Sequence, residues 1–455
     1  MRLLPLCLLL PLPLWSADPI LEPPTSAPGN YSRLATGHFG AVEEGAVIAR
    51  GFGPEAAWFN PAGLAHEHRT TLSGNASLFE RVDMEVSGDS SSTPSSALGM
   101  YPVFVGNSFP LVEPEEGRPW VLGLALVTTE SWNQKVSLDV EVDEGGGLSR
   151  TVSFDNSSEV TGLVPTVALG VQWNEHWSFG ANLRVQYSSY EVLANGSQRV
   201  LDADRAPVFS QSSNSSLDLS VWQASAGLGV QYRPTEHWRF GLMANTPSWQ
   251  IAGDGDAKFD LFFSTQAVIA DGRLRANDFD VEVKQPWSVG IGAAYVAESW
   301  EFESDLLVFG DPGSYSLFEY DSDLVLTVRE TGSGNVTTVN EAIPAATSNS
   351  QATYIASLGG RFHLNERYAL HGGMSYNRSP TDSSSGENAF RDVDLWSLSL
   401  GASRSTDAVS TVLGGRVSWG EDRDILVEDL IGDDQQLASL EYLILSLTFS
   451  TAYRF

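Results

Sequence analysis

Residues 440–455, LEYLILSLTFSTAYRF, alternate between two kinds of side chain up to the last residue of the chain. One face is apolar and aromatic: Leu443, Leu445, Leu447, Phe449, Thr451, Tyr453 and Phe455. The other is mostly small or polar: Ile444, Ser446, Thr448, Ser450, Ala452 and Arg454. A period of two predicts a β-strand. Its length exceeds the roughly 5–6 residues usual in soluble sheets and suits a tilted strand crossing a bilayer, which needs about 9–11 residues.

The same alternation recurs upstream, in WSFGANLRVQYSSYE (177–191) and DLWSLSLGAS (394–403). An apolar outer face and a small or polar inner face are typical of a membrane β-barrel. Counting such segments predicts an all-β fold, a 14-stranded antiparallel transmembrane β-barrel, and an even count places both chain ends on one side. The predicted strands are 70–85, 94–104, 119–131, 160–173, 177–190, 218–233, 237–249, 286–297, 299–310, 352–364, 367–378, 393–405, 408–419 and 439–455.

Four tight turns share one form, a turn carrying Glu followed by an aromatic residue: WNEHWSF (173–179), RPTEHWRF (233–240), YVAESWEF (295–302) and HLNERYAL (363–370). Their aromatics, Trp177, Trp238, Trp300 and Tyr368, are expected to form a girdle at one membrane boundary. Long polar segments alternate with these turns and are predicted to be loops at the opposite end: 193–216, 251–284, 311–350, 379–392 and 420–438. Pro102, Pro165 and Pro286 fall in or near predicted strands. Because proline cannot donate to the ladder, each should mark either a local bend or a strand end that the prediction has misplaced.

Residues 1–17 are predicted to be a signal peptide, with Arg2 before an apolar run and small residues at 16–17. The single cysteine, Cys7, lies inside this leader, so neither disulfides nor a cysteine-ligated metal is expected in the mature chain. No later stretch of 18 apolar residues predicts a membrane helix. A net charge of −31 argues against nucleic acid as a partner. The signal peptide and the predicted transmembrane β-barrel together predict that the protein is located in the bacterial outer membrane.

Residues 18–68 precede the predicted barrel (69–455) and are rich in Gly and Ala with little alternation. The runs 43–51 and 55–59 are predicted to form short helical turns, the second ending at Asn60-Pro61, since a residue before proline is disfavoured in the α region. A compact segment of this kind is expected to fold inside the lumen as an N-terminal hatch, or plug.

The run Gly45 to Ala49, followed by Asn60-Pro61-Ala62-Gly63-Leu64, resembles the hatch of the FadL-type long-chain fatty-acid transporters of the bacterial outer membrane. The terminal Phe455 resembles the signal read by the outer-membrane assembly machinery. The resemblance implies a passive transporter for hydrophobic compounds, with long-chain fatty acids as the default cargo and a sideways exit through the barrel wall. It also implies that Asn60, Pro61, Ala62 and Gly63 gate the hatch. Alternatively, this turn merely guides the chain into the first strand.

Rival functions are uptake of alkanes or aromatic hydrocarbons, a surface receptor or adhesin whose acidic loops bind a partner, and an outer-membrane enzyme. No catalytic motif is present, so the chain is expected not to be an enzyme. No cofactor is expected, and no metal, since His66 and His68 supply at most two ligands. Outer-membrane lipid and lipopolysaccharide are expected to surround a monomer.

A fatty-acid carboxylate needs a cation, and arginine offers two parallel donors. The alternation points several basic residues into the lumen, of which Arg184, Arg361 and Arg416 are the candidates to bind a ligand carboxylate; the others are Arg239, His363 and His371. These cations could instead pair with inward acids, namely Glu301, Glu303 and Asp305. The acyl chain would need an apolar groove, for which Leu261, Phe262 and Phe263 are candidates. Alternatively, these apolar residues only pack the loops together.

Overall fold

The computed structural model describes residues 30–88, 91–112, 118–341, 345–381, 393–426 and 437–455. The predicted signal peptide (1–17) and the first part of the predicted N-terminal extension lie outside these residues. No helix in the described ranges is long and apolar enough to cross a membrane.

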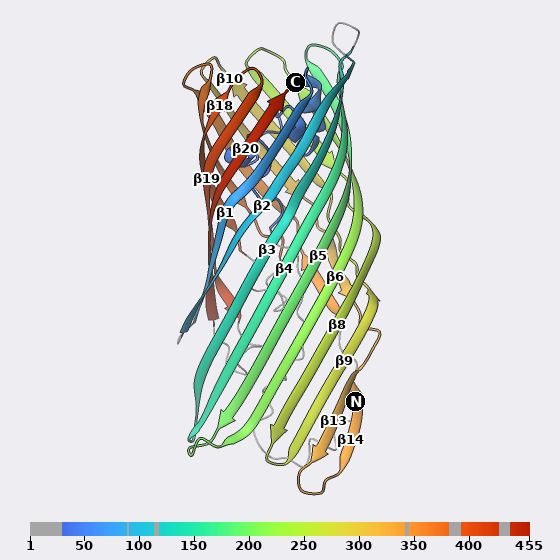
Figure 1. Ribbon diagram of the computed structural model, residues 1–455, viewed down its shortest axis with the longest axis vertical. Coiled ribbons are helices and arrows are strands. Elements are labelled where there is room, and N and C mark those ends of the chain that lie inside the picture. The colour runs from blue at the N-terminus through green and yellow to red at the C-terminus, as the bar shows by residue number, and fades with distance from the viewer. Residues whose placement is uncertain (1–29, 89–90, 113–117, 342–344, 382–392, 427–436) are drawn as a thin grey trace.

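A closed antiparallel ring of 14 strands forms the body of the molecule (Figure 1). In order around the ring, these strands are β1 (Thr71–Gly88), β2 (Ser91–Val112), β3 (Trp120–Gly145), β4 (Leu148–Gln172), β5 (Trp177–Leu201), β6 (Pro207–Tyr232), β7 (Trp238–Asn245), β10 (Ser288–Val296), β11 (Trp300–Phe309), β16 (Thr353–His363), β17 (Tyr368–Asn377), β18 (Leu395–Ser405), β19 (Val409–Leu426) and β20 (Leu437–Arg454). The ring closes where Thr71 of β1 pairs with Arg454 of β20. The predicted barrel is therefore confirmed, and its C-terminal strand is the one that seals it.

The two faces of the ring differ as the alternation predicts. On β20, Leu443, Leu445 and Phe449 are exposed on the outer surface, whereas Thr448 and Ser450 are buried inside. Each predicted girdle aromatic begins a strand after a tight turn and is exposed: Trp177, Trp238, Trp300 and Tyr368. Rings on neighbouring strands stack, as in the pair Trp177–Tyr232, whose centroids are 4.2 Å apart. The outer wall thus presents an apolar belt that is edged by aromatics at the end carrying the tight turns.

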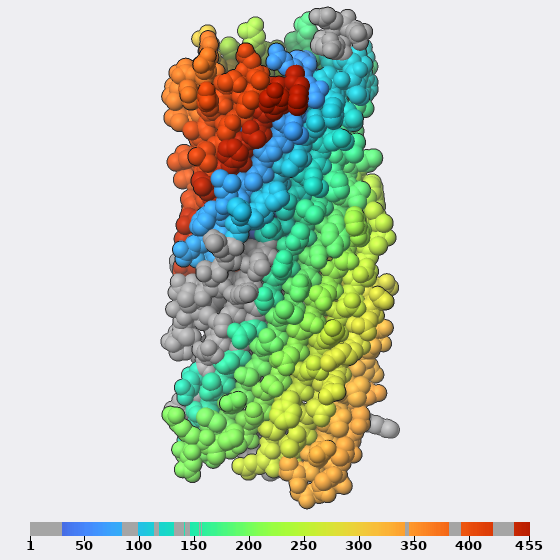
Figure 2. Space-filling view, in the orientation of Figure 1, coloured from blue at the N-terminus to red at the C-terminus, as the bar shows by residue number. Residues whose placement is uncertain are grey.

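One side of the barrel extends far beyond the ring as a tall wall. It consists of the outer parts of β3 to β6, continued by β8 (Trp249–Thr265), β9 (Val268–Asp280), β13 (Leu324–Glu330) and β14 (Val336–Glu341). Figure 2 shows it as bands from green to orange that reach past the blue and red strands. A separate two-stranded sheet, β12 (Gly313–Phe318) and β15 (Ala346–Ser350), packs its apolar residues against this wall.

The tall wall corrects the prediction of long loops. Segments 193–216 and 251–284 are mostly the paired ends of β5, β6, β8 and β9 rather than loops. The described part of 311–350 contains four strands. Beyond the belt the alternation inverts: Leu217 and Leu219 are buried inside, whereas Asp218 is exposed on the outside. Beyond the belt the outer face of the wall meets water instead of lipid, so polar residues face outward. The amino-acid composition of these strand segments therefore resembles that of a loop. Residues 382–392 and 427–436, within the other two predicted loops, lie outside the described residues.

Pro102 and Pro165 mark irregularities within strands, as predicted, whereas Pro286 marks a strand end that the prediction placed two residues too early. Pro102 lies at a register shift between β1 and β2. Pro165 lies where the β4–β5 ladder is interrupted between the pairs Leu163–Tyr187 and Thr166–Arg184. Pro286 lies in the connection between β9 and β10.

Candidate functional site

The N-terminal segment 30–70 fills the ring as a hatch at the end where the chain terminates (Figure 1). Its helical parts are three 3₁₀ turns, η1 (Gly40–Val42), η2 (Pro54–Ala57) and η3 (Pro61–His66). The predicted helix over 43–51 is wrong, because Glu44 and Gly45 have φ of 51° and 73°, a left-handed conformation that ends a helix. The predicted turn over 55–59 corresponds to η2. Most hatch side chains are buried against the wall.

A row of glycines in the wall receives the Asn60-Pro61 turn. Gly170, Gly180 and Gly229 pair directly across β4, β5 and β6. A Cβ on Gly170 would lie 2.8 Å from the Pro61 carbonyl oxygen, and one on Gly229 would lie 2.8 Å from Pro61 Cδ. Such approaches are closer than real Cβ contacts allow, so these positions must lack a side chain for the hatch to sit where it does.

Two further glycine pairs receive the other side of the hatch. Gly359 and Gly373 pair across β16 and β17, and a Cβ on either would meet the backbone or side chain of Glu43. Gly401 and Gly414 pair across β18 and β19 and contact Val42. The hatch is thus seated in a socket of glycines on both sides of the ring.

Asn60 ties this seat together. Its side-chain amide donates to the carbonyls of Ile48 (2.8 Å) and Val230 (3.1 Å), and its Oδ1 accepts from the N–H of Ala62 (3.2 Å). It therefore caps η3, with Pro61 in the first helical position, where no donor is needed. Gly63 N–H donates to the Asn60 carbonyl at 2.9 Å. All four residues of the predicted hatch motif are buried.

A cluster of buried charges joins the hatch to β11. The Arg50 guanidinium pairs with Glu43 in the hatch, and with Glu303 at 2.9 Å and Glu301 at 3.4 Å in the wall. The backbone N–H groups of Ile48 and Ala49 donate to Asp305 (3.0 Å) and Glu303 (2.6 Å). Burial raises the pKa of Glu43, but Arg50 and a hydrogen bond from His371 outweigh it and hold that pKa at about 2. The hatch is therefore attached by charge as well as by shape.

Two histidines extend this attachment on the other side. His371 of β17 lies between Glu43 (2.7 Å) and Ser403 (2.8 Å). His38 of the hatch lies between Ser450 (2.6 Å) and Ser410 (2.9 Å), and burial lowers its pKa to about 3, so its ring is neutral. None of these three Ser–His contacts borders the cavity described next. They join the hatch to β17–β20.

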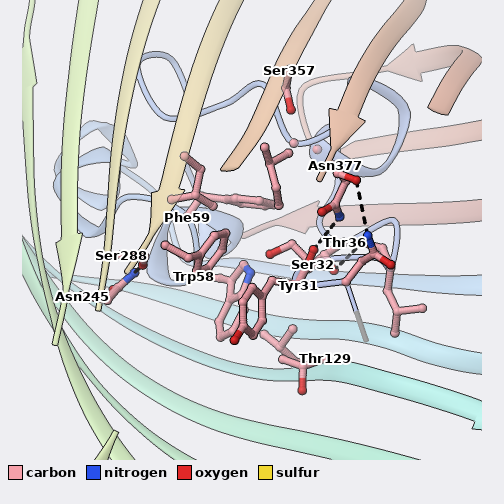
Figure 3. Close-up of a pocket in the computed structure, with 18 of the residues that line it drawn as sticks. Tyr31, Ser32, Thr36, Trp58, Phe59, Thr129, Asn245, Ser288, Ser357 and Asn377 are labelled. Carbon is pink, nitrogen blue, oxygen red and sulfur yellow. Dashed lines mark hydrogen bonds between the residues drawn. The ribbon is translucent and has the colours of Figure 1, made fainter. Parts of the chain in front are cut away.

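A cavity of about 190 Å³ lies between the hatch and the wall (Figure 3). Its lining includes Trp58 and Phe59 of the hatch, Arg184 of β5 and Thr129 of β3. A further part is formed by Asn30 to Ser32 and Leu34 to Thr36. We call the whole segment 30–36 the N-terminal strap. The strap is anchored through Asn377, whose side-chain amide donates to the Tyr31 carbonyl at 2.7 Å.

The three candidate cations have different surroundings. Arg361 pairs with Glu301 of the neighbouring wall strand at 2.7 Å and lies 4.7 Å from the centroid of the Phe39 ring of the hatch. Arg416 pairs with Glu44 of the hatch at 3.0 Å. Arg184 donates to the Trp58 carbonyl at 2.6 Å and lies 4.4 Å from the centroid of the Trp58 ring. Its Nε is buried without a partner, and within the described ranges no acid pairs with it. Arg184 is thus the candidate whose charge is not neutralised.

The other predicted site residues lie elsewhere. His363 contacts Glu301 at 3.2 Å, and His66 forms a hydrogen bond with Ser178 at 3.2 Å. Leu261 is buried in a cluster with Phe259 and Leu274 in the tall wall, and Phe262 is exposed on its outer face. Leu261, Phe262 and Phe263 are thus part of a strand rather than a loop and do not line the cavity. Leu261 and Phe263 pack within the tall wall, in line with the alternative role of packing these segments together.

The ring has a seam next to this cavity. β2 pairs with β3 only from Val112–Trp120 to Phe104–Val127, although β2 continues to pair with β1, and β3 with β4. Beyond Phe104 the described parts of β2 and β3 separate (Figure 1). Thr128 Oγ1 donates to the Pro102 carbonyl at 2.8 Å at this point. The outer surface beside the seam is apolar, with Met100, Val105 and Leu126 exposed.

Sequence reasoning missed three parts of this site: the glycine socket, the N-terminal strap and the seam. The socket does leave a signal, since glycines recur at inward positions in LGVQW, FGANL and LGGRF. The strap and the seam leave none that is specific, because both depend on which distant residues meet across the lumen.

A closed barrel with an apolar belt and a lumen filled by a buried hatch is a plugged outer-membrane transport barrel. The chain belongs to the family described as outer membrane protein transport protein (OMPP1/FadL/TodX), whose model matches residues 33–415. This membership places it in the outer membrane as a transporter of hydrophobic compounds.

Solved structures agree with the fold. A Pseudomonas aeruginosa FadL homologue matches with a TM-score of 0.62 at 15% identity, covering 94% of this chain and 100% of its own. The P. putida toluene transporter TodX also gives 0.62 at 15%, covering 92% and 98%. The Ralstonia pickettii toluene transporter TbuX gives 0.58 at 13%, covering 92% and 98%. A search of curated proteins finds no significant match.

Proposed function

We propose that the cargo is a hydrophobic carboxylate, with long-chain fatty acids as the first candidate, and that Arg184 binds its carboxylate in the cavity. The observation that carries this proposal is the unneutralised charge of Arg184. A partly buried guanidinium without an acid is unfavourable, and a ligand carboxylate would offset that cost with charge-assisted hydrogen bonds. Trp58, which covers the guanidinium, would contact the first methylenes of the chain.

In this proposal the hatch gates entry and the seam provides the exit. The Asn60-Pro61-Ala62-Gly63 turn holds the hatch against the glycine row until ligand binding loosens it. Thr129 and Val127 of β3 border both the cavity and the separation of β2 from β3. A ligand in the cavity therefore lies beside a place where the wall lacks paired strands and where the outer surface is apolar. Movement is passive, along the gradient of the hydrophobic compound.

One observation favours a second candidate, a monocyclic aromatic hydrocarbon. The cavity of about 190 Å³ is close to the roughly 150 Å³ that accommodates benzene in an engineered protein cavity. It is smaller than the roughly 300–1,000 Å³ of sites for drug-sized ligands. Trp58, Phe59 and Tyr31 supply aromatic surface. A long acyl chain would have to extend beyond the cavity as it stands, toward the seam.

Direct binding separates the two candidates. Purified protein is titrated with oleate, oleyl alcohol and toluene, and compared with Arg184→Gln. A hydrogen bond to a charged group contributes about 1.5–3 kcal/mol, so oleate should bind roughly 10- to 150-fold more weakly to the variant, and oleyl alcohol equally well. Arg199→Gln, at an exposed position on the same strand, is the matched control. Equal oleate affinity in all three proteins would refute a carboxylate site at Arg184, and toluene binding alone would support the aromatic cargo.

Uptake tests the gating role. Cells that lack their own transporter receive this chain or the double variant Asn60→Ala/Pro61→Ala, at equal outer-membrane levels. A change in the uptake of labelled oleate is expected. Unchanged uptake would assign the turn to guiding the chain into β1.

A further inference from the structure

The strap places one arginine across the seam. Arg33 Nη1 pairs with Glu80 of β1 at 3.2 Å, and Arg33 Nη2 donates to the Ser131 carbonyl of β3 at 2.8 Å. β2 lies between these two strands in the ring, so the guanidinium spans its position from the lumen side. Neither member of the pair is open to solvent, since the side chains of Arg33 and Glu80 are 13% and 10% exposed.

The contact lies at the level where β2 and β3 separate. Ser131 comes four residues after Val127, the last residue of β3 that pairs with β2. Glu80 pairs with Gly99, five residues from Phe104 on β2. The guanidinium therefore joins β1 to β3 where the described backbones of β2 and β3 are no longer joined to each other.

The same residue is attached to the hatch network. The Arg33 carbonyl accepts a hydrogen bond from Arg416 Nη1 at 2.6 Å, and Arg416 also pairs with Glu44 of the hatch. Tyr31, two residues earlier, stacks on Phe309 at 4.6 Å and borders the cavity. A displacement of Glu44 or of the strap would thus be transmitted to the residue that spans the seam.

We propose that Arg33, Glu80 and the Ser131 carbonyl form a clasp that closes the seam from inside and controls the sideways release of cargo into the outer leaflet. The role given to the clasp rests on the proposed transport function, whereas the experiment that tests the clasp does not. The clasp is closed in the structure described here. Breaking the Arg33–Glu80 pair should open a path between the cavity and the lipid.

The test measures access from lipid and needs no cargo. Thr129→Cys places a thiol in the cavity wall beside the seam, and a maleimide carried on a lipid acyl chain labels it from the bilayer. We expect labelling to be at least roughly 5-fold faster in Arg33→Ala and in Glu80→Ala, the low end of usual coupling between sites. The double variant should be no faster than the faster single one, because both remove the same pair.

Controls keep the result interpretable. Arg81→Ala removes the neighbouring Arg81–Asp83 pair, 2.9 Å long, from the outer face of the same strand, and should label as slowly as the parent. Arg33→Lys keeps the charge but cannot reach two partners as a guanidinium does, and should label at an intermediate rate. The heat-dependent gel shift of folded barrels verifies each variant.

Labelling unchanged or slower in both single variants would overturn the clasp. Faster labelling in Arg33→Ala alone would overturn it as well, because the arginine would then act by volume rather than through Glu80. Oleate and toluene uptake by the parent, measured in parallel, tests the proposed function separately. A parent that carries neither compound would refute that function and leave the labelling result standing.

Discussion

Gly373→Ala should release the hatch, whereas Gly372→Ala, one residue away on the same strand, should not. A Cβ on Gly373 would lie 2.6 Å from the carbonyl carbon of Glu43 and 2.8 Å from the backbone nitrogen of Glu44. A Cβ on Gly372 would meet only Leu400 Cδ2 at 3.5 Å and the Ser399 carbonyl at 3.7 Å, ordinary contacts on the outer side. The two substitutions are chemically identical and differ in which face receives the methyl group.

The magnitude follows from the distances. Carbon atoms are most favourably about 3.5–4.0 Å apart, so the hatch backbone would have to retreat by about 1 Å. The Glu43 backbone cannot move away freely, because Arg50 and His371 both hold the Glu43 side-chain carboxylate in place. Overpacking of this kind costs about 1–3 kcal/mol, which corresponds to a roughly 5- to 150-fold rise in the population of displaced hatch.

Ion conductance in planar bilayers reports this population, because a displaced hatch opens a water path through the ring. The frequency of openings should rise about 5- to 150-fold in Gly373→Ala over the parent and stay at the parental level in Gly372→Ala. Equal opening in the two variants would refute the reasoning, since it would show that the inward methyl group does not act through the hatch.

Three further predictions concern the hatch. Arg50→Met should destabilise the docked hatch by about 3–5 kcal/mol, because Glu43 and Glu303 would be left buried without their counter-charge. The channel should then be open for most of the recording in planar bilayers, and an opening frequency equal to that of the parent would contradict the prediction. Asn60→Ala should lower the stability of the docked hatch by about 1–3 kcal/mol, because it leaves buried carbonyls without a hydrogen-bond donor. The midpoint temperature of thermal unfolding should fall, and an unchanged midpoint would count against the capping role of Asn60. Burial raises the pKa of Glu55 from 4.5 to about 7, although three backbone N–H donors oppose the rise. The docked hatch then holds a proton that the released hatch gives up, so docking should weaken as the pH rises from about 4.5 through 7, and Glu55→Gln should remove this dependence of the opening frequency on pH.

The barrel could be predicted because lipid imposes a strict pattern. Inside the belt every outward residue faces hydrocarbon, so the alternation in 440–455 is almost uninterrupted. The tall wall could not be separated from loops for the same reason. Outside the belt Asp218 and its neighbours face water, and the segment 193–216 becomes polar although both strands continue. The sequence does not show where a strand passes from lipid into water. The loops were predicted because a polar segment was taken to be a segment without regular secondary structure.

The site could be predicted in kind but not in its pairings. The alternation places Arg184, Arg361 and Arg416 in the lumen correctly. Which of them is neutralised depends on where Glu44 and Glu301 lie in three dimensions. Glu44 is 372 residues from its partner Arg416, and Glu301 lies on a different strand from its partner Arg361. The hatch motif was recognisable because Asn60 to Gly63 are contiguous in the sequence, whereas the row Gly170, Gly180 and Gly229 exists only once three strands are aligned in register.

The polar character of the seat bears on how a hatch can move at all. A plug held by apolar packing would expose that surface to water on release, at a cost of roughly 25 cal/mol for each Å². On one side the wall contributes glycines, serines and carboxylates, and the hatch contributes backbone N–H groups and Arg50. On the other side the seat is apolar, since Ala57 and Leu64 of the hatch pack with Phe104, Val121 and Ala168 of the wall. Water can replace most of the polar partners, so the net contribution of each hydrogen bond is only about 0.5–1.5 kcal/mol. Release of the polar side therefore exchanges one set of polar contacts for another, whereas release of the side at Leu64 would expose apolar surface. A ligand that alters a few of the polar contacts, at Trp58 or along the strap, can shift the balance on that side without unfolding the barrel.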